Sequence, residues 1–468
     1  MKTYQDFLAL TDSEITDFIF TTISEYVGSS EYKQALIAES YDAHRNKTIV
    51  DYQKLIYTIT GKAVPDTYSA NYKLASNFFH RFVTQENQYL LGNGVMWSEN
   101  ATAEKLGDEF DANLQKAGHW ALVDSVSYGF FDYDQLRVFK MTEFAPLYDE
   151  ENGALMAGIR FWQVSKNKPL RATFYEIDGY TEYIEKDGER RILAPKRAYK
   201  ITVTGDEVDR QNGTEIYDGE NYPTFPIVPL WANENHQSEL VGMREQIDCY
   251  DLIKSGFADT VDEASYIYWA LQDEGGMDDV DLTKFVERMK TIHAAVVQGD
   301  SARVEAHSID APTESREALL DRLAADMYKD FMAFDTDKVA DGAVTATQIK
   351  SAYEPLSNKV DGYEYQVKEF LKDILKVAGV DDEPTFTRSK IVNVQEEMNT
   401  LLAAAQYLPQ EYVTKKILTL MGDGDKAEDI LEQMENEDVN RYGEVGERPE
   451  ETVPEGVQGN GGQAAQEQ

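Results

Sequence analysis

The run at residues 225–261 constrains the fold most, because it joins a short apolar strand directly to a long helix. Its sequence is FPIVPLWANENHQSELVGMREQIDCYDLIKSGFADTV. Prolines bracket the apolar part, an Asn-rich turn follows, and an amphipathic helix completes the run. The run contains no set of side chains typical of catalysis. It is therefore predicted to be a structural joint, where a strand ends one body and a helix leaves it.

The helix in this run is expected to begin at Ser238, a favoured N-cap residue. Glu239 follows in the first turn, where a negative charge complements the helix dipole. Apolar residues recur at steps of three and four, at Leu240, Met243, Ile247, Tyr250, Ile253 and Phe257. The pattern continues for about 24 residues, or roughly 36 Å of helix. Charged residues, mostly acidic, occupy the remaining faces.

The sequence before the joint predicts an α+β domain. Residues 1–131 are expected to be mostly helical, with helices at 70–91 and at about 103–131. Residues 134–231 change to alternating patterns, separated by turn sequences at 151–153 and 186–188. These patterns predict an antiparallel sheet of about five to seven strands.

The sequence after the joint predicts a small insert between two long helices. The insert at 263–312 has strand-like runs and a short helix, and a segment of this size needs neighbours to bury its surface. A helix is expected to return from about 315 to 334, with an apolar stripe at Leu320, Leu323, Met327 and Phe331. A loop without a regular period follows. The next helix, at 345–378, contains Pro355, which should kink it.

The C-terminal part is expected to be helical at 395–440. The acidic, low-complexity end at 441–468 is expected to be disordered.

Charge and motifs exclude several functions. The 468 residues include 85 acids and 45 bases, a formal net charge of −40. This charge argues against tight nucleic-acid binding, which needs basic residues to displace counterions. No phosphate-loop or HExxH motif occurs, the six histidines are scattered, and the one cysteine, Cys249, is expected to be a packed structural thiol. No apolar run approaches the roughly 18 residues that span a bilayer, and no secretory signal begins the chain. We expect no cofactor and no metal.

Four stretches in a particular order carry a resemblance to a known family. They are NYKLASNFFHRFVTQENQYLLGNG at 71–94, FPIVPLWANENHQSELVGMREQIDCYDLIKSGFADTVDE at 225–263, AVTATQIKSAYEPLSNKVDGYEYQVKEFLKDIL at 343–375 and YLPQEYVTKKILTLMGDGDKAEDILEQMENE at 407–437. Together they resemble the portal proteins of tailed bacteriophages, in the family typical of long-tailed phages of Gram-positive hosts. The resemblance covers nearly the whole chain.

The resemblance implies a portal fold, in which the segments found above become named parts. Residues 1–236 would be the α/β wing and 263–312 the small α/β clip. The two stem helices would be 237–262 and 313–333. Residues 334–394 would hold the tunnel loop, the kinked helix and the rest of the wing, 395–440 would be the α-helical crown, and 441–468 the disordered tail.

The same resemblance implies a non-enzymatic virion protein that forms a ring of twelve copies at one capsid vertex. Double-stranded DNA would pass through it without sequence specificity, during packaging and at ejection. Expected partners are the terminase large subunit, the head–tail adaptor, and the major capsid and scaffolding proteins, without a membrane. The protein would reside in the virion, and in the host cytoplasm during assembly.

Particular residues are implied for the channel and the stem. The tunnel loop would bring Asp335, Asp337, Lys338, Val339 and Asp341 to the DNA, with Lys338 as the hypothesised point of phosphate attraction. Stem packing, against the returning helix and adjacent copies, would involve Leu240, Met243, Ile247, Tyr250, Phe257, Leu320, Leu323 and Met327. The acidic faces should meet solvent or DNA. On this basis Ile247→Asp should disrupt rings more than it unfolds the wing.

Two other functions stay open. Another virion structural protein, such as an adaptor or a minor head protein, is one, although such chains are usually shorter and lack the helix–insert–helix arrangement. An enzyme with an unrecognised active site is the second. It would require a pocket with converging titratable groups, and the sequence offers no triad or metal-binding set.

Overall fold

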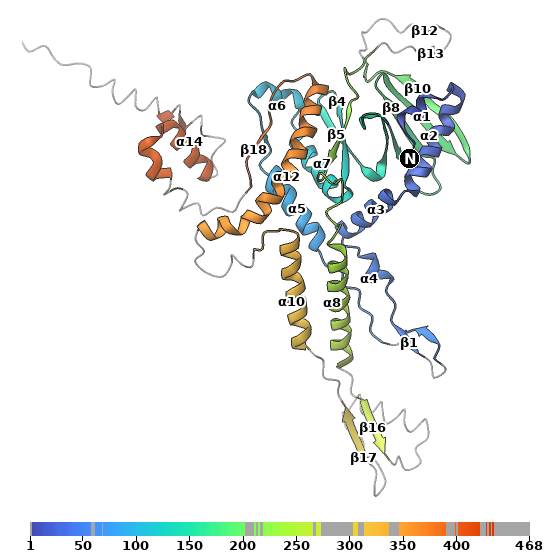
Figure 1. Ribbon diagram of the computed structural model, residues 1–468, viewed down its shortest axis with the longest axis vertical. Coiled ribbons are helices and arrows are strands. Elements are labelled where there is room, and N and C mark those ends of the chain that lie inside the picture. Colours follow the sequence, from blue (N-terminus) through green and yellow to red (C-terminus); the bar gives the residue numbers. More distant parts are fainter. Residues whose placement is uncertain are drawn as a thin grey trace, which may run out of the picture. The chain divides into compact units, whose positions relative to one another are not determined.

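The computed structural model describes residues 2–57, 61–67, 69–201, 210–211, 214–215, 219–264, 268–272, 303–307, 313–336, 346–389 and 401–421, with the single positions 398, 427, 430, 431, 433 and 434. The chain divides into two compact units. The first comprises Met1–Ala343 and Lys350–Lys390, and the second comprises Val344–Ile349 and Ile391–Gln468. The first unit contains the two largest sheets and most of the described helices (Figure 1).

Two antiparallel sheets form the centre of the first unit. A five-stranded meander has the order β10-β9-β8-β7-β6. Its strands are β6 (Phe144–Tyr148), β7 (Leu155–Trp162), β8 (Leu170–Glu176), β9 (Gly179–Lys186) and β10 (Glu189–Arg197). A three-stranded sheet has the order β15-β4-β5, from β4 (Val126–Asp132), β5 (Gln135–Lys140) and β15 (Ile227–Trp231). The predicted antiparallel sheet region is confirmed, divided into two sheets.

The turn predicted at residues 186–188 joins β9 to β10. Asp187 and Gly188 both have positive φ, 53° and 84°, between the paired residues Lys186 and Glu189. A two-residue hairpin loop of this kind matches the twist of its strands when both central residues have positive φ, and Asp-Gly adopts that geometry readily.

Short strand pairs surround these sheets. They are β1 (Leu55–Tyr57) with β2 (Ala63–Pro65), β3 (Val95–Met96) with β18 (Thr385–Phe386), β11 (Lys200–Ile201) with β14 (Gly219–Glu220), and β12 (Arg210–Gln211) with β13 (Thr214–Glu215). One more pair, β16 (Tyr268–Gln272) with β17 (Arg303–His307), comes from the two ends of the predicted insert. Both strands overlap runs expected to be strands, while residues 273–302 lie outside the described part.

Helices cover the sheets and extend from them. The N-terminal ones are α1 (Tyr4–Leu8), α2 (Asp12–Gly28), α3 (Ser30–Asp42), α4 (Lys47–Asp51), α5 (Phe78–Leu91), α6 (Asn100–Leu106) and α7 (Phe110–Asp124), with the 3-10 turn η1 (Met141–Glu143). Three long helices follow, α8 (Arg244–Ala264), α10 (Thr313–Asp330) and α12 (Ala346–Ala378). The second unit includes η2 (Ala405–Tyr407) and α14 (Gln410–Met421).

The core of the first unit lies where α7 and α12 meet the three-stranded sheet. One stripe of α12 is buried, at Leu356, Val360, Tyr363, Val367, Phe370 and Ile374. Gly118 allows α7 and α12 to pack closely, because a Cβ at this position would overlap the Tyr363 hydroxyl of α12. The Tyr363 hydroxyl donates to Asn87 Oδ1 of α5 at 3.0 Å, which links α12 to that helix.

Two predicted helices have wrong boundaries. Residues 125–131 are not helical, because β4 begins at Val126 and is almost entirely buried between β5 and β15. An unbroken apolar run gives no period that distinguishes a buried strand from a buried helix. Likewise residues 70–77 precede α5 without forming helix.

Candidate functional site at the helix pair and its junction with the sheets

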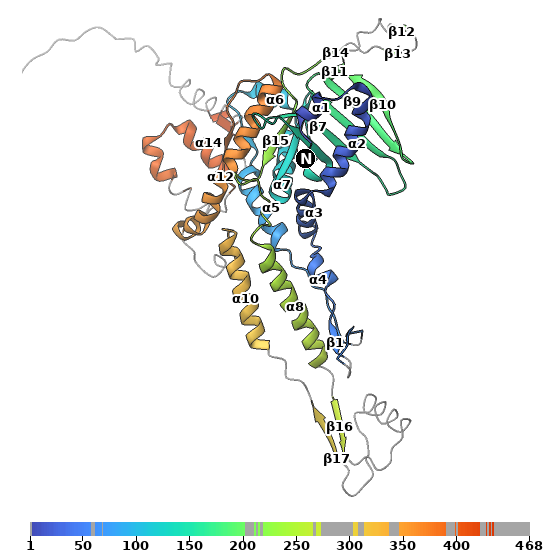
Figure 2. The ribbon, with the colours of Figure 1, turned by 45° about the vertical axis from the view of Figure 1, so that its right-hand side comes forward.

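Helices α8 and α10 lie side by side, as Figures 1 and 2 both show. They correspond to the two predicted long helices, but α8 begins at Arg244 instead of Ser238. Gly242 lies two residues before that point, and its φ of +85° is incompatible with a helical backbone. Ser238 is therefore not the N-cap of α8. Its hydroxyl instead donates to Val123 O of α7 at 2.5 Å, which ties the turn to the body.

The predicted apolar stripe is only partly covered by its own chain. Its fully buried members are Leu240, Met243, Ile247 and Met327, of which the first two lie in the turn before α8. Tyr250, Phe257, Leu320 and Leu323 are half-buried. The two helices are also joined by Arg316, whose guanidinium donates to Thr260 Oγ1 at 2.6 Å and to Gly256 O at 3.1 Å.

A polar stripe on α8 holds an extended segment of the chain. Asp251, Ser255 and Asp259 are spaced four residues apart and are at most 4% exposed. They accept backbone N–H groups of Ser76 at 2.8 Å, Leu74 at 3.0 Å and Tyr72 at 2.7 Å, respectively. Four helical residues rise about 6.0 Å, and two extended residues rise about 6.6 Å. The helix therefore presents acceptors at nearly the spacing of a strand edge. We name these three residues the polar ladder.

The ladder explains why residues 70–77 are not helical. Their alternate amides are satisfied by α8 side chains, which favours an extended backbone over a helix. The expectation that the acidic faces of α8 meet solvent or DNA is wrong for Asp251 and Asp259, which are 0% and 3% exposed, whereas Glu245 is exposed. Their second oxygens bind Asn46 Nδ2 at 2.9 Å and Lys54 Nζ at 2.9 Å. Burial raises the pKa of Asp251 despite the hydrogen bonds from Asn46 and Ser76.

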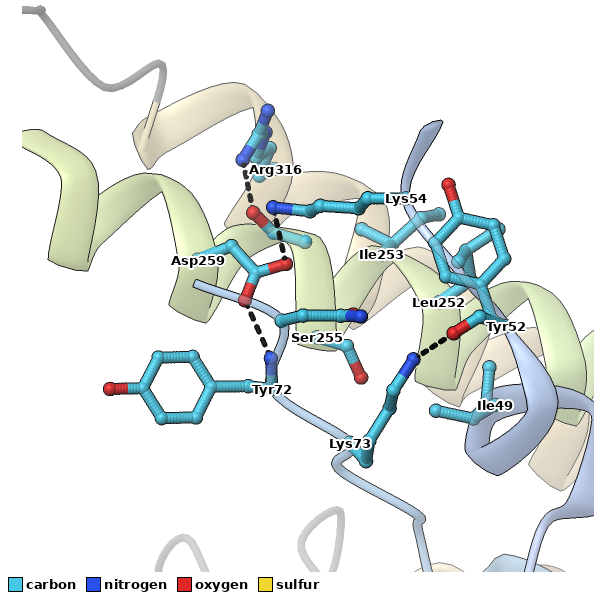
Figure 3. A pocket seen from close by; sticks show the side chains of 12 residues that line it. Ile49, Tyr52, Lys54, Tyr72, Lys73, Leu252, Ile253, Ser255, Asp259 and Arg316 are labelled. Atoms are coloured by element: carbon cyan, nitrogen blue, oxygen red, sulfur yellow. Dashed lines mark hydrogen bonds and ion pairs between the residues drawn. The ribbon is translucent and has the colours of Figure 1, made fainter. Parts of the chain in front are cut away.

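A cavity of about 280 Å³ opens beside the ladder, between α8 and the segments at 49–54 and 71–73 (Figure 3). Lys54, Lys73 and Arg316 line it together with Asp259. Lys73 donates to the carbonyl of Tyr52, and Lys54 donates to Ala70 O at 2.7 Å. These two lysines thus link the segments to each other, and Lys54 also joins them to α8 through Asp259.

A cluster of three charged side chains, of which Glu86 is buried, lies where α5, α12 and the turn before α8 meet. Lys359 Nζ of α12 is 2.9 Å from Glu86 Oε2 and 2.6 Å from Glu239 Oε2. The same ammonium lies 3.1 Å from the centre of the Phe331 ring, just after α10. Burial raises the pKa of Glu86 to about 7, with a further contribution from the charge of Glu239, although Lys359 lowers it. One lysine thus joins two carboxylates and the ends of the helix pair.

The segment that follows α10 is anchored on α5. The Gln85 side chain accepts from Phe334 N and donates to Phe334 O, both at 2.9 Å. The Phe334 ring stacks on Tyr353 of α12 at 3.9 Å, and Tyr353 stacks on Tyr89 of α5 at 5.5 Å. Residues on both sides of the predicted tunnel loop are therefore held together.

The predicted loop residues are mostly beyond this anchor. Asp335 is half-buried directly after Phe334. Asp337, Lys338, Val339 and Asp341 lie outside the described residues. Pro355 lies inside α12, which continues through it.

The structure brings together histidines that are scattered in the sequence. His80 Nδ1 of α5 lies 2.8 Å from Asp42 Oδ1, and His119 Nε2 of α7 lies 3.0 Å from Asp42 Oδ2. Burial raises the pKa of Asp42, but hydrogen bonds and charges from His119 and His80 outweigh it, so this pKa is lowered. The cluster is not evident from the sequence, because 38 and 39 residues separate its members along the chain.

Cys249 was predicted to be a packed structural thiol, and this prediction is wrong because the thiol is exposed.

Comparison with known proteins identifies the class of this chain as a bacteriophage structural protein. The sequence profile described as phage portal protein, SPP1 Gp6-like, matches residues 38–439. Because the match covers most of the 468 residues, the chain belongs to the phage portal protein family, SPP1 Gp6-like. The predicted family resemblance is confirmed.

Two curated relatives are both named portal proteins. The protein of Clostridium phage phiCD119 is 24% identical over 234 residues, which cover 48% of this chain and 51% of that protein. The protein of Bacillus phage SPP1 is 24% identical over 387 residues, which cover 75% of this chain and 73% of that protein. The chain thus spans about half of the first relative and about three quarters of the second.

Solved structures with a distant likeness come from gene transfer agent particles. One is the neck of the native particle computed with C12 symmetry, at 10% identity and a TM-score of 0.43, covering 73% of this chain and 89% of that one. Another is the neck of the empty particle computed with C6 symmetry, at 10% identity and a TM-score of 0.42, covering 74% of this chain and 90% of that one.

Among the described residues, no helix has the length and hydropathy needed to cross a bilayer.

Proposed function

We propose that this chain is the subunit of a ring at one capsid vertex, through which double-stranded DNA is packaged and ejected. Family membership is the observation that carries the proposal. The expected ring has twelve copies. Its expected partners are the terminase large subunit, the head–tail adaptor, and the capsid and scaffolding proteins. The protein would assemble in the host cytoplasm and remain in the virion.

In this proposal the two sheets and their helices form the wing, α8 and α10 form the stem, and the strands β16 and β17 belong to the clip. The segment at 334–344 is the tunnel loop, α12 is the kinked helix, and residues 395–440 are the crown. The kink is assigned to Pro355, which has no N–H for the helical ladder. Figure 1 shows that α12, which contains Pro355, is not straight.

Helices α8 and α10 carry apolar side chains that the rest of the chain does not cover and that could contact neighbouring copies. Leu252 and Val261 of α8 are 41% and 50% exposed, and Leu319 of α10 is 46% exposed. Phe257 and Leu320 beside them are half-buried. Adjacent copies would cover these residues, at a gain of roughly 25 cal/mol for each Å² of apolar surface removed from water.

The tunnel loop is proposed to meet the DNA, with Lys338 as a point of phosphate attraction. Support comes from the anchored start of this segment, because Phe334 is bonded to the Gln85 side chain of α5 and stacks on Tyr353 of α12. In a packaging assay, Lys338→Glu should reduce the DNA packaged per particle, and Lys390→Glu, outside the loop, serves as the matched charge control. Full packaging by the Lys338 variant would exclude this role.

Electron microscopy of the purified full chain tests the ring itself. Class averages should show rings with a central hole, and native mass spectrometry should give the copy number. A monodisperse monomer over a range of salt and protein concentrations would contradict the ring. Rings that fail to support packaging in a reconstituted system would instead favour another virion structural role.

A further inference from the structure

We propose that Asp42, His80 and His119 form a binding site for a first-row divalent transition-metal ion, with zinc as the representative case. The inference does not depend on ring formation, because all three residues belong to one chain. It rests on the donor set, the separations of the ligand atoms and the position of the carboxylate at a helix end.

The donor set and its geometry suit such an ion. Two imidazole nitrogens and a carboxylate oxygen lie within 4.8 Å of one another. Each imidazole is hydrogen-bonded to its own Asp42 oxygen, with N···O separations of 2.8 and 3.0 Å. Shifts of about half an ångström would widen them to the roughly 3.3–3.6 Å between ligands of a tetrahedral ion with bonds of about 2.0–2.2 Å. Imidazole favours zinc and its neighbours over magnesium and calcium, which prefer oxygen ligands. The His80 side chain is 40% exposed, so a water molecule can reach the remaining coordination position.

The local field also favours a cation. Asp42 is the last residue of α3, where the helix dipole places partial negative charge. Its side chain is only 11% exposed, so solvent screens the carboxylate weakly. Without a metal, two imidazole N–H groups are its partners. An ion with a charge of +2 would compensate this negative charge more fully.

Such an ion would connect three helices of the wing. Asp42 is on α3, His80 on α5 and His119 on α7. Helix α5 also carries Phe82, whose ring stacks on Phe331 at 4.8 Å, and Phe78, whose ring meets Tyr250 of α8 at 5.0 Å. The metal would therefore hold α5 in position, and α5 is the helix that contacts α8 and the end of α10.

Zinc titration of the full chain tests the proposal after dialysis against a chelator. Isothermal titration calorimetry should show one high-affinity zinc per chain. His119→Ala and Asp42→Asn should each weaken binding at least about 10- to 100-fold, since even outer-shell changes have effects of this size. His236→Ala, which removes an exposed histidine elsewhere, should leave the affinity unchanged. Excess magnesium should not displace the zinc.

Cobalt substitution provides a second measurement. The visible absorption of bound cobalt should report nitrogen ligation in the parent chain and disappear in His80→Ala, which changes a partly exposed residue and should preserve the fold by circular dichroism. Equal zinc affinity in the parent and the His119 variant, or complete competition by magnesium, would overturn the proposal. Binding that is lost only in the cluster variants would establish it.

Discussion

At the residue scale, the buried carboxyl of Glu86 is the group whose surroundings change its pKa to a value near neutral pH. It is 1% exposed and shares Lys359 with Glu239. Because two carboxylates and one ammonium leave an excess negative charge, the cluster favours keeping one proton at neutral pH. Burial is the main reason that the pKa of Glu86 is raised from 4.5 to about 7. A raised folded-state pKa means that the folded chain holds a proton that the unfolded chain releases.

Glu86→Gln should therefore change how stability depends on pH. In the parent chain, the contribution of Glu86 is fully present below pH 4.5 and is lost as pH rises through about 7. The slope is at most about 1.4 kcal/mol per pH unit. Urea unfolding between pH 5 and 7.5 should show a smaller loss of stability with rising pH in Glu86→Gln than in the parent. Glu245→Gln, at an exposed position of α8, is the control. Parallel pH profiles for the parent and Glu86→Gln would contradict this account.

At the element scale, the polar ladder makes one face of α8 act as the edge of a sheet. A buried backbone N–H without a partner costs about 1–3 kcal/mol, and residues 72–76 place three part-buried N–H groups against the helix. The ladder provides an acceptor for each of them. The position of α8 against the body is thus set by hydrogen bonds as well as by apolar packing at Ile247.

Removing ladder residues should release the extended segment before it unfolds the body. Ser255→Ala leaves Leu74 N–H without its acceptor, and Asp251→Ala does the same for Ser76, so each should cost about 1–3 kcal/mol. Hydrogen exchange with mass spectrometry should show faster exchange at residues 72–76 in both variants. Asp321→Ala removes an exposed acid from α10 and should leave that exchange unchanged. Unaltered exchange in the Ser255 and Asp251 variants would refute the ladder.

At the scale of the whole molecule, burial within one chain separates residues that stabilise the subunit from residues available to neighbours. Ile247 is only 2% exposed in the single chain. Ile247→Asp is therefore expected to destabilise the subunit itself, in addition to its predicted effect on rings. Leu319, at 46% exposure, is the better residue for testing assembly.

A pair of variants tests this distinction. Leu319→Asp should reduce the fraction of rings at least tenfold in analytical ultracentrifugation, while the melting temperature of the free subunit stays near that of the parent. Ile247→Asp should lower the subunit's unfolding free energy by about 3–5 kcal/mol, because it buries a charge without a partner. Leu319→Ala is the milder control. If Leu319→Asp formed rings as readily as the parent, α10 would not contribute this face to the assembly.

The sequence alone determined much of the organisation. Alternating residues at 134–231 predicted antiparallel strands, and the turn predicted at 186–188 joins β9 to β10. The long helices were predictable because their apolar residues repeat at helical spacing, as in the buried stripe of α12 from Leu356 to Ile374. The family resemblance also came from local runs of sequence, which the profile match confirms. All of these signals are periodic or contiguous.

Only the tertiary structure decided which polar residues act together. In the sequence, Asp251 and Asp259 look like part of a solvent-exposed acidic helix face. In the structure the segment with Tyr72 and Ser76 covers them, and its amides donate to their carboxylates. Asp42 and His119 become neighbours only when α3 packs on α7. Hydrophobic periodicity records which face of an element is buried, whereas hydrogen-bond partners depend on which distant segment covers that face.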